Sequence, residues 1–413
     1  MAPPHAETLL TQRTSVTPSS PEQVDLHLKT TSLSPRHTFQ VPEVTIKQLR
    51  DAVPAHCFKR DTLRSLSYVL VDLVGVVTLV TAATWGIPLL PGGPMVRALG
   101  WILYSILQGI VCTGLWVLAH ECGHQAFSPS KVVNTTVGFL IHSLLLVPYQ
   151  AWRISHAQHH AATGHMTRDQ VFVPPTRSTL GLLSPSHDKK EGEEEEDSPL
   201  WEDTPISALY GMVGMLLIGW PYYLFANASG QRHYPPGTSH FNPHSPMYTD
   251  AQGKPKYSSQ ILFSTLGVLT VALGLLLATL TWGALPVFLY YGLPYFQVNA
   301  WLVLITYLQH TDPDLPHYRE KEWTFVRGAL LTIDRDWGFF LNTALHHITD
   351  THIAHHLFSQ MPHYHAQEAT KAIRSVLGPH YRMDTSPPWK ALWRAYNACH
   401  FVEDEGDIVF YKR

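Results

Sequence analysis

The stretch His352-Ile353-Ala354-His355-His356 decides how the rest of the chain folds, because two clusters of the same kind lie far upstream of it. They are His120-Glu121-Cys122-Gly123-His124 and His156-Ala157-Gln158-His159-His160. Histidines three or four residues apart project from one face of a helix, and each neutral imidazole offers one nitrogen to iron, zinc or copper. Eight such nitrogens are twice what one tetrahedral zinc ion uses. These three histidine boxes therefore predict two metal ions with open positions for a small molecule.

Composition indicates a membrane protein. Of 413 residues, 45% are hydrophobic and only 15% are charged, which is typical of a polytopic membrane protein rather than of soluble domains. The net charge of -3 gives no reason to expect nucleic acid as a partner. The cysteines have no paired spacing, so we expect free thiols in a reducing compartment; they are Cys57, Cys112, Cys122 and Cys399. On a helix, Cys122 points away from His120 and His124, so it is expected to pack rather than bind metal.

Four apolar runs are long enough to cross a bilayer, at residues 68–90, 98–119, 260–282 and 286–309. Two further apolar stretches, 132–149 and 206–225, are expected to lie in the membrane interface instead. If either of them crossed the membrane, the histidine boxes could not share one site. The predicted fold is therefore an all-α polytopic membrane protein with four transmembrane helices and a helical cap that carries the histidines.

The distribution of basic residues indicates on which side of the membrane this cap lies. Lysines and arginines concentrate on the side of the boxes, among them Lys59, Arg60, Arg64, Lys131, Arg153 and Arg168. By the positive-inside rule the cap and both termini are cytosolic. The sequons at Asn134 and Asn227 are then expected to stay without glycan. The predicted organisation is a disordered cytosolic tail over 1–55, one domain over 56–400 and a C-terminal tail over 401–413, with the acidic run 188–197 as a solvated loop.

Single histidines and acids outside the boxes need separate interpretation. The second and fourth spans both end at the cytosolic face, so His310 is the best candidate for a ninth ligand, whereas His142 and His346 are weaker candidates. The nearby His317 is interpreted as a surface or packing residue. An unpaired carboxylate in a membrane is costly, so Asp72 is expected to pair with a polar group near the cytosolic end of the first span.

The segments 120–128, 156–172 and 350–358 resemble the three histidine boxes of membrane fatty-acyl desaturases, and segment 307–318 is also similar to that family. The likeness covers about residues 60–400 and is closest to the microsomal oleate Δ12 desaturases of fungi and plants. It implies an oxidoreductase with two bound Fe ions that uses dioxygen and two electrons to insert a cis double bond, converting oleate to linoleate. It carries metal-ligand roles onto His120, His124, His156, His159, His160, His310, His352, His355 and His356.

The resemblance also raises the question of further contacts to the metals. In related acyl-CoA desaturases an asparagine four residues before the histidine that matches His310 reaches one metal through water, and Thr306 stands at that position here. Carboxylates often fix the second nitrogen of a metal-bound imidazole. Glu121 and Asp350 are candidates for that role, or else solvated acids at helix ends.

The partners follow from the same resemblance. It implies a fatty acyl lipid as substrate, linked to phospholipid or to coenzyme A, in the endoplasmic reticulum membrane. Fused relatives carry a cytochrome b5 domain with a His-Pro-Gly-Gly haem motif, but the Pro-Gly-Gly at 91–93 follows Leu90 within a membrane turn. We therefore expect a separate cytochrome b5, served by its reductase, to dock on the basic cytosolic face.

Other functions remain open at the level of sequence. His120-Glu121-x-x-His124 also fits the zinc-protease pattern, but this leaves two boxes unexplained. A histidine-rich metal transporter would place its ligands near the middle of the bilayer, whereas these boxes stand at the ends of spans. An ω3 desaturase, a bifunctional Δ12/ω3 enzyme, a hydroxylase and an acetylenase would share the same motifs.

Overall fold

The structure is a computed structural model that describes residues 39–182 and 204–413. Residues Val41–Arg413 form one compact unit. The predicted acidic loop at 188–197 and most of the predicted N-terminal tail lie outside the described residues. In this part of the chain the architecture is mainly helical, with two small two-stranded sheets.

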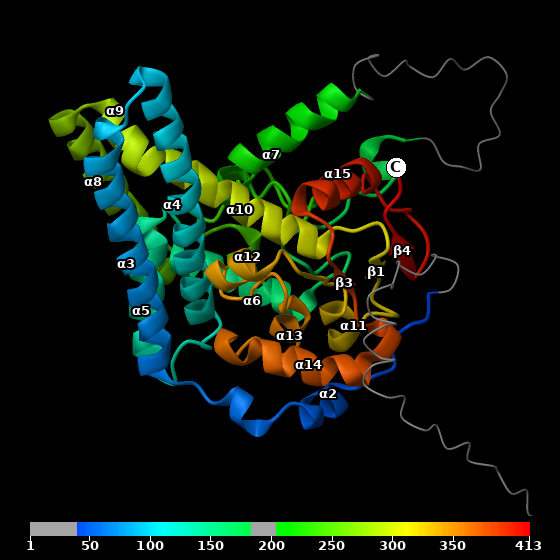
Figure 1. Ribbon diagram of the computed structural model, residues 1–413. Helices are drawn as coiled ribbons and strands as arrows, with labels where there is room; N and C mark the ends of the chain where they lie inside the picture. Colours follow the sequence, from blue (N-terminus) through cyan, green and yellow to red (C-terminus); the bar gives the residue numbers. More distant parts are fainter. Residues whose placement is uncertain (1–38, 183–203) are drawn as a thin grey trace, which may run out of the picture. The chain divides into compact units, whose positions relative to one another are not determined.

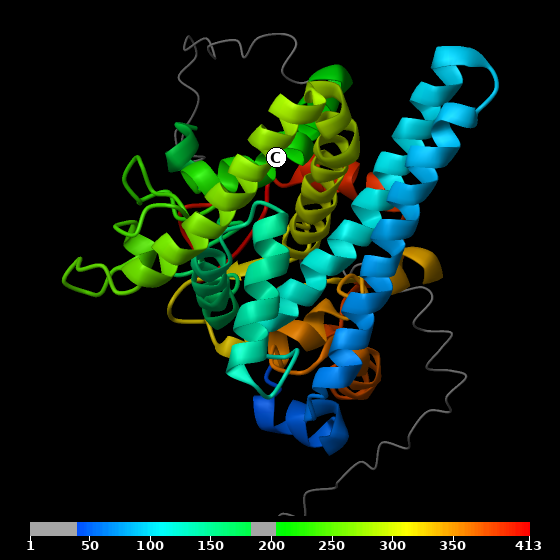
Figure 2. The same cartoon turned by 90° about the vertical axis from the view of Figure 1, so that its left-hand side faces the viewer.

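The first hairpin consists of α3 (Thr62–Gly86) and α4 (Gly93–Gly123), which lie side by side in Figures 1 and 2. The Asp61 side chain caps α3 by accepting the backbone N–H groups of Leu63 and Arg64. Between the helices Gly92 has a φ of 99°, which only glycine adopts without strain. The α3 surface is largely exposed, whereas the second half of α4 is buried, so α4 enters the interior of the protein with its C-terminal half.

The second hairpin consists of α8 (Ser258–Trp282) and a broken helix made of α9 (Ala284–Val287), a π-helical turn (Phe288–Gly292) and α10 (Leu293–His310). Helix α10 packs against α4. The approach is close at Gly109, where a Cβ would lie 2.2 Å from Cβ of Gln297. Both helices carry histidines at their C-terminal ends, His120 and His124 for α4 and His310 for α10.

The two stretches expected in the membrane interface behave differently from each other. The first, 132–149, becomes α5 (Lys131–Leu144), and the next helix, α6 (Tyr149–Ala162), meets it at an angle of 108°. The second becomes α7 (Pro205–Ala226), which is long and apolar enough to cross a bilayer. The described chain thus has five helices that could span by length and composition, or six spans if the bent pair α5–α6 is counted as one, against the four crossings predicted.

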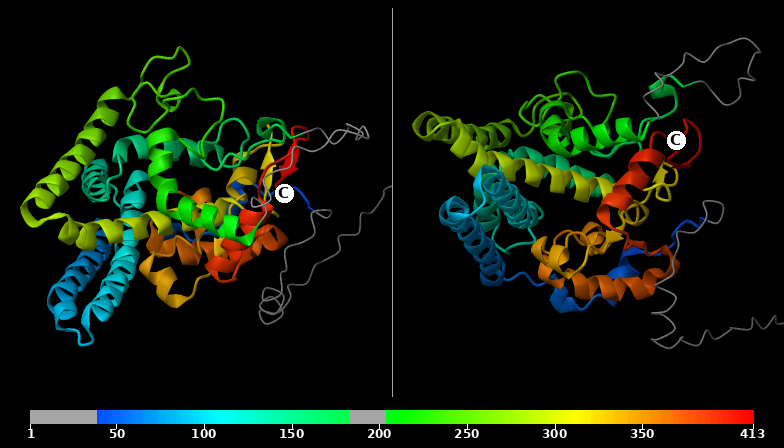
Figure 3. Two further views of the ribbon diagram at one scale, coloured as in Figure 1. Left: turned by 90° about the horizontal axis from the view of Figure 1, so that it is seen from above. Right: turned by 45° about the horizontal axis from the view of Figure 1, so that its top comes forward.

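The remaining elements form a cap around the ends of α4 and α10. It contains α2 (Ile46–Ala52), η2 (Ala55–Phe58), α11 (Phe325–Ala329), α12 (Phe339–Ala344), α13 (His352–Leu357), η7 (His363–His365), α14 (Ala366–Leu377) and α15 (Pro388–Ala398). One apolar cluster joins Leu49 of α2, Leu357 of α13 and Ile373 of α14. Helix α15 lies beside α7 (Figures 1 and 3).

Both predicted tails contain regular structure in the part of the chain that is described. Helix α2 lies within the range 1–55 that was expected to be disordered, and it packs against α14. At the other end, β4 (Ile408–Phe410) pairs antiparallel with β1 (Pro316–Tyr318), so the range 401–413 is part of the folded cap. The second sheet pairs β2 (Asp334–Arg335) with β3 (Met383–Asp384). These strands are only two or three residues long, so the sequence shows no alternation of polar and apolar residues from which they could be predicted.

Candidate metal centre

Four helices bring the three histidine boxes and His310 to one place. His120 stands near the end of α4 and His124 is its C-cap residue, while the second box lies on α6. His310 is the last residue of α10, and the third box lies on the short helix α13. The nine rings that were predicted to bind metal therefore meet in one buried cluster.

Five of these histidines form the first group, in which each residue has a ring nitrogen within 4.8 Å of the others: His120, His124, His156, His160 and His355. Nε2 of His120 lies 2.9 Å from Nε2 of His156 and 3.1 Å from Nε2 of His124. Nitrogens that bind one ion at about 2.0–2.1 Å are separated from one another by roughly 3 Å. The spacing within this group therefore suits a single metal ion.

The other four histidines form the second group. Ring nitrogens of His159, His310 and His356 lie within 4.8 Å of one another. His352 joins them, since its Nε2 lies 3.1 Å from Nε2 of both His310 and His356. The rings of His160 and His356 stack with centroids 4.0 Å apart, which places the two groups side by side. A division into five and four nitrogens agrees with the prediction of two ions.

Burial keeps the imidazoles of the third box neutral. Desolvation lowers the pKa of His355 to about 3, and desolvation with neighbouring histidines lowers the pKa of His352 and His356 well below the ordinary value. Neutral rings have the lone pair that a metal requires. Nε2 of His355 is buried and has no hydrogen-bond partner among the described residues. Such an orphaned acceptor fits a site built for a metal ion.

Two polar side chains fix the orientation of rings in the second group. Oδ1 of Asp169 lies 2.6 Å from Nδ1 of His159, and its Oδ2 accepts the backbone N–H of Gly164 at 2.7 Å. The Thr163 hydroxyl donates to the carbonyl of His159 and lies 3.1 Å from Nδ1 of His356. In both rings Nδ1 is engaged and Nε2 is left for a metal. Sequence reasoning missed both residues, because Asp169 stands in a loop where helical spacing gives no signal.

Of the predicted carboxylate partners, Glu121 lies beside the cluster and Asp350 does not. Oε2 of Glu121 accepts the backbone N–H of His363 at 2.9 Å, and its Oε1 lies 3.9 Å from Nδ1 of His355. The hydrogen bonds of Asp350 go to His347 and Gln367. The partners of Asp350 in the structure are therefore not box histidines, because the turn before α13 directs it toward His347.

Thr306 faces the same region as His310 but has an intrahelical partner. Its hydroxyl donates to the carbonyl of Leu302 at 2.7 Å, as threonine commonly does within a helix. Cys122 packs in an apolar cluster with Leu118 and Phe127, as the sequence predicted.

The other histidines considered as ligands have different partners. Nε2 of His346 lies 2.8 Å from Oδ2 of Asp72, which confirms that Asp72 pairs with a polar group. His142 is buried beside Trp116, whose carbonyl oxygen lies 3.4 Å from its Nε2. His317 is only 4% exposed and packs edge-on against another aromatic ring, so it is a packing residue rather than a surface residue.

A buried arginine fixes the end of α10 that carries His310. Arg335 is 1% exposed, and its Nε donates to the carbonyl of Leu308 at 2.7 Å. Its guanidinium also contacts the carboxylates of Asp312, at 3.2 Å, and Asp384. Asp312 additionally accepts from Arg394 at 3.0 Å. These contacts satisfy a helix-end carbonyl two residues before His310 and hold that ring in position.

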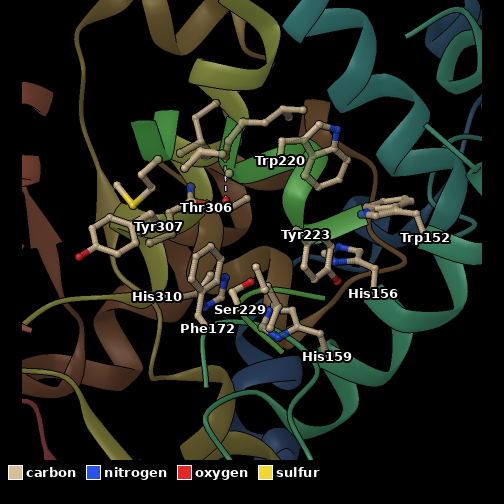
Figure 4. Close-up of a pocket in the computed structure, with 18 of the residues that line it drawn as sticks. Trp152, His156, His159, Phe172, Trp220, Tyr223, Ser229, Thr306, Tyr307 and His310 are labelled. Atoms are coloured by element: carbon tan, nitrogen blue, oxygen red, sulfur yellow. Dashed lines mark hydrogen bonds between the residues drawn. The ribbon is translucent and has the colours of Figure 1, made fainter. Parts of the chain in front are cut away.

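An apolar cavity of about 450 Å³ adjoins the histidines. Most of its walls come from α4, α6, α7 and α10, and five of the nine histidines line it: His120, His156, His159 and His310, with His352 from α13. Figure 4 shows His156, His159 and His310 on one side, with Trp220, Tyr223 and Tyr307 around the remainder. The volume lies within the range of ligand pockets, and the predominantly apolar walls suit a hydrocarbon chain.

Comparison with known proteins gives a consistent result. A family model described as "Fatty acid desaturase" matches residues 97–387. The chain is 51% identical over 418 residues to a "Delta(12) fatty acid desaturase" of Mortierella isabellina, with 100% of both chains covered. It is 44% identical over 370 residues to an "Omega-6 fatty acid desaturase, endoplasmic reticulum isozyme 2" of Glycine max, with 90% of each covered. A "Delta(12)-fatty-acid desaturase" of Arabidopsis thaliana is 43% identical over 379 residues, with 91% of this chain and 93% of the relative covered.

Proposed function

The chain belongs to the fatty acid desaturase family, and from this premise we propose that it is a membrane Δ12 desaturase that converts oleoyl to linoleoyl chains. One hydrogen leaves each of C12 and C13, and these two hydrogens, two protons and two electrons reduce one dioxygen to two waters. The relatives named Δ12 desaturase cover the full length of this chain, which supports that bond position. The substrate class is a fatty acyl lipid.

The observation that carries this proposal is the contact between a histidine cluster and an apolar cavity. Nine imidazoles converge in two groups, and five of them also form part of the cavity wall. A methylene of a chain lying in the cavity would therefore be next to the metal site. The two features together support oxidation of an unactivated hydrocarbon, because simple lipid binding would require the cavity but not a cluster of nine imidazoles beside it.

The nine histidines fit two iron ions, which when bound would supply the oxidising power that no side chain provides. The protein residues position and shield that site. Asp169 and Thr163 hold the rings of His159 and His356 with Nε2 directed to the cluster. Trp152 and Trp220 line the cavity with apolar surface and exclude water from the reacting carbons.

We propose four membrane crossings, with α7 in the cytosolic interface. Met212, in the first half of α7, packs against Leu392 of α15. Near the other end, the carbonyl of Leu224 accepts the backbone N–H of His240 at 2.8 Å. His240 in turn lies 3.0 Å from the hydroxyl of Ser155 on α6. A crossing helix would hold its ends about 30 Å apart on opposite faces, whereas both parts of α7 contact elements of the histidine side.

Electron supply and location follow from this topology. We propose that both termini are cytosolic and that the protein resides in the endoplasmic reticulum, where the named soybean relative is placed. A separate cytochrome b5 would deliver the electrons. Lys59, Arg64 and Lys131 are exposed at the ends of helices that adjoin the cap, and their charge suits an acidic redox partner.

Two rival functions receive less support. A zinc protease built on His120 and His124 would leave the other histidines of the cluster without a role. A transporter would hold its ligands within the bilayer, but His124 and His310 stand at the ends of α4 and α10.

Expression in yeast, which supplies oleate and cytochrome b5, tests the proposed function. We expect linoleate to appear in the lipids of cells that produce the chain, and none in cells that produce His355→Ala at the same level. A membrane-inserted protein that leaves the fatty acid profile unchanged would contradict the proposal. Further desaturation of linoleate would instead identify a bifunctional Δ12/ω3 enzyme.

A further inference from the structure

A second cluster of metal-binding side chains lies outside the nine-histidine site. His56 and Cys57 belong to η2, the short helix that precedes α3. His365 is the N-cap residue of α14, and Glu368 lies in the first turn of that helix. The four residues each offer one ligand atom, and these atoms all lie within 4.8 Å of one another. Segments more than 300 residues apart thus converge at one point.

The separations are close to those around a tetrahedral ion. Nε2 of His56 lies 3.7 Å from Sγ of Cys57 and 2.8 Å from Oε2 of Glu368. Ligands at about 2.3 Å for sulfur and 2.0–2.2 Å for nitrogen or oxygen would be separated by roughly 3.3–3.6 Å. The sulfur–nitrogen distance of 3.7 Å is close to this spacing, and the nitrogen–oxygen distance of 2.8 Å would have to lengthen by about 0.5 Å as the ion entered. His365 closes the set, with its ring edge-on to that of His56 at 5.4 Å.

We propose that His56, Cys57, His365 and Glu368 form a structural site for one divalent cation of the zinc class. Thiolate, imidazole and carboxylate are the donors that zinc uses, and four protein ligands leave no position open for a reacting molecule. Binding would deprotonate the thiol and replace the hydrogen bond between His56 and Glu368. The inference is independent of the proposed desaturase activity.

The position of the site gives the ion a structural effect. Cys57 is fully buried and belongs to the apolar cluster that also contains Ala354 and Leu357 of α13. An ion at this point would tether η2 to α14 and close the cluster on which α13 rests. Since α13 carries the third histidine box, the cation would stabilise the helix that presents His352, His355 and His356.

The alternative is that these groups form an ordinary ion pair beside a buried thiol. The side chains of His56 and Glu368 are 52% and 50% exposed, so their contact is screened by solvent. Arg64, which lies over the ring of Tyr364 at 4.1 Å, adds a positive charge close to His365. Burial raises the pKa of the Cys57 thiol to about 11, so this thiol is neutral in a bare ion pair, whereas a bound dication would be offset by the deprotonated sulfur and the Glu368 carboxylate together.

Titration of the purified full-length protein with Co²⁺ distinguishes a cation site from an ordinary ion pair. Cobalt bound to a thiolate has an intense near-ultraviolet charge-transfer absorption, whereas cobalt bound only by imidazole lacks it. The nine-histidine cluster contains no thiol among its grouped ligands, so this absorption reports on Cys57 alone. We expect one equivalent of thiolate-bound cobalt, displaced by Zn²⁺ and absent from Cys57→Ala. Cys399→Ala, which removes a thiol outside the cluster, should keep the absorption.

A second pair of variants covers the case in which Cys57→Ala fails to fold. His56→Asn and Glu368→Gln change half-exposed side chains, so the fold should tolerate them. We expect each to weaken cobalt binding at the thiolate site by at least about tenfold. Absence of the thiolate absorption in the unmodified protein, its persistence in Cys57→Ala, or unchanged affinity in both half-exposed variants would overturn the proposal.

Discussion

Oδ1 of Asp169 lies 2.6 Å from Nδ1 of His159, and both side chains are buried. The same carboxylate accepts the backbone N–H groups of Gly164 and Gln170, both at 2.7 Å. It therefore ties the turn after α6 to a ring of the second histidine group. Because Nδ1 is held, His159 has only one tautomer that can present Nε2 to the cluster.

Asp169→Asn is expected to lower iron content and desaturation by roughly 10- to 100-fold, as loss of an outer partner of a metal ligand commonly does. The amide keeps the size of the carboxylate but not its charge. Glu320→Gln is the matched control, since Glu320 also contacts a histidine, His165 at 2.8 Å, outside the cluster. The orienting role of Asp169 is tested by measuring iron content and linoleate production in both variants. Equal iron content in the two would refute this role.

The histidine ligands could be predicted from the sequence, whereas their partner Asp169 could not. Box spacing predicts which faces of helices carry ligands, and topology adds His310, because both depend on regular helices. Asp169 and Thr163 act from a loop and its boundary, where no periodicity exists. Asp350 was chosen for its place beside the third box, but the backbone turns it toward His347.

Some features of the fold could also be predicted from the sequence, and others could not. Apolar length located the helices of both hairpins to within a few residues. The same criterion cannot decide whether α7 crosses, because its length and apolarity are sufficient for a span. The cap strands β1 and β4 are too short to leave a pattern, so the range 401–413 was interpreted as a tail.

A bulky side chain at Gly214 should obstruct the cavity. Gly214 lines it from α7, and a Cβ there meets no atom within 4 Å. Gly214→Phe is expected to cut conversion of oleate at least about tenfold while iron content stays normal, because the ring takes space that the acyl chain needs. Gly274→Phe is the control, since this exposed glycine on α8 has equally open surroundings away from the cavity. Equal conversion by the two variants would show that the chain binds elsewhere.

The pair formed by Asp72 and His346 should stabilise the packing of α3 on the cap. Its atoms are 2.8 Å apart, and the side chains are 12% and 7% exposed. Removing one partner of a buried pair costs about 3–5 kcal/mol, because the other is left without compensation. His346→Leu should therefore lower the thermal stability of the purified protein markedly. The double variant Asp72→Leu/His346→Leu should recover much of it, and additive losses would argue against a coupled pair.

The four-crossing topology predicts that Asn134 and Asn227 carry no glycan when the protein is made in endoplasmic reticulum membranes. Asn227 ends α7, so it would reach the lumen if α7 crossed, whereas Asn134 lies at the start of α5, on the side where α4 ends. A loop with a new sequon inserted between Gly92 and Gly93 should be modified, because this turn would face the lumen. A glycan on Asn227 would mean that α7 crosses the membrane.

His310 is the ligand placed by topology as well as by resemblance, and its loss should be as severe as loss of a box histidine. Its Nε2 lies 3.1 Å from Nε2 of His352, within the second group. Water replaces a missing imidazole poorly, so His310→Ala should lose iron and activity to the same extent as His355→Ala.

The control for this comparison is His317→Ala, made and assayed beside the other two. The ring of His317 packs edge-on against Tyr411 with centroids 5.0 Å apart. Its removal should cost about 1–3 kcal/mol of stability through the cavity it leaves, while the iron count stays near that of the unmodified protein. Normal iron in His310→Ala, or loss of iron confined to His317→Ala, would show that the fourth nitrogen of the second group comes from a different histidine.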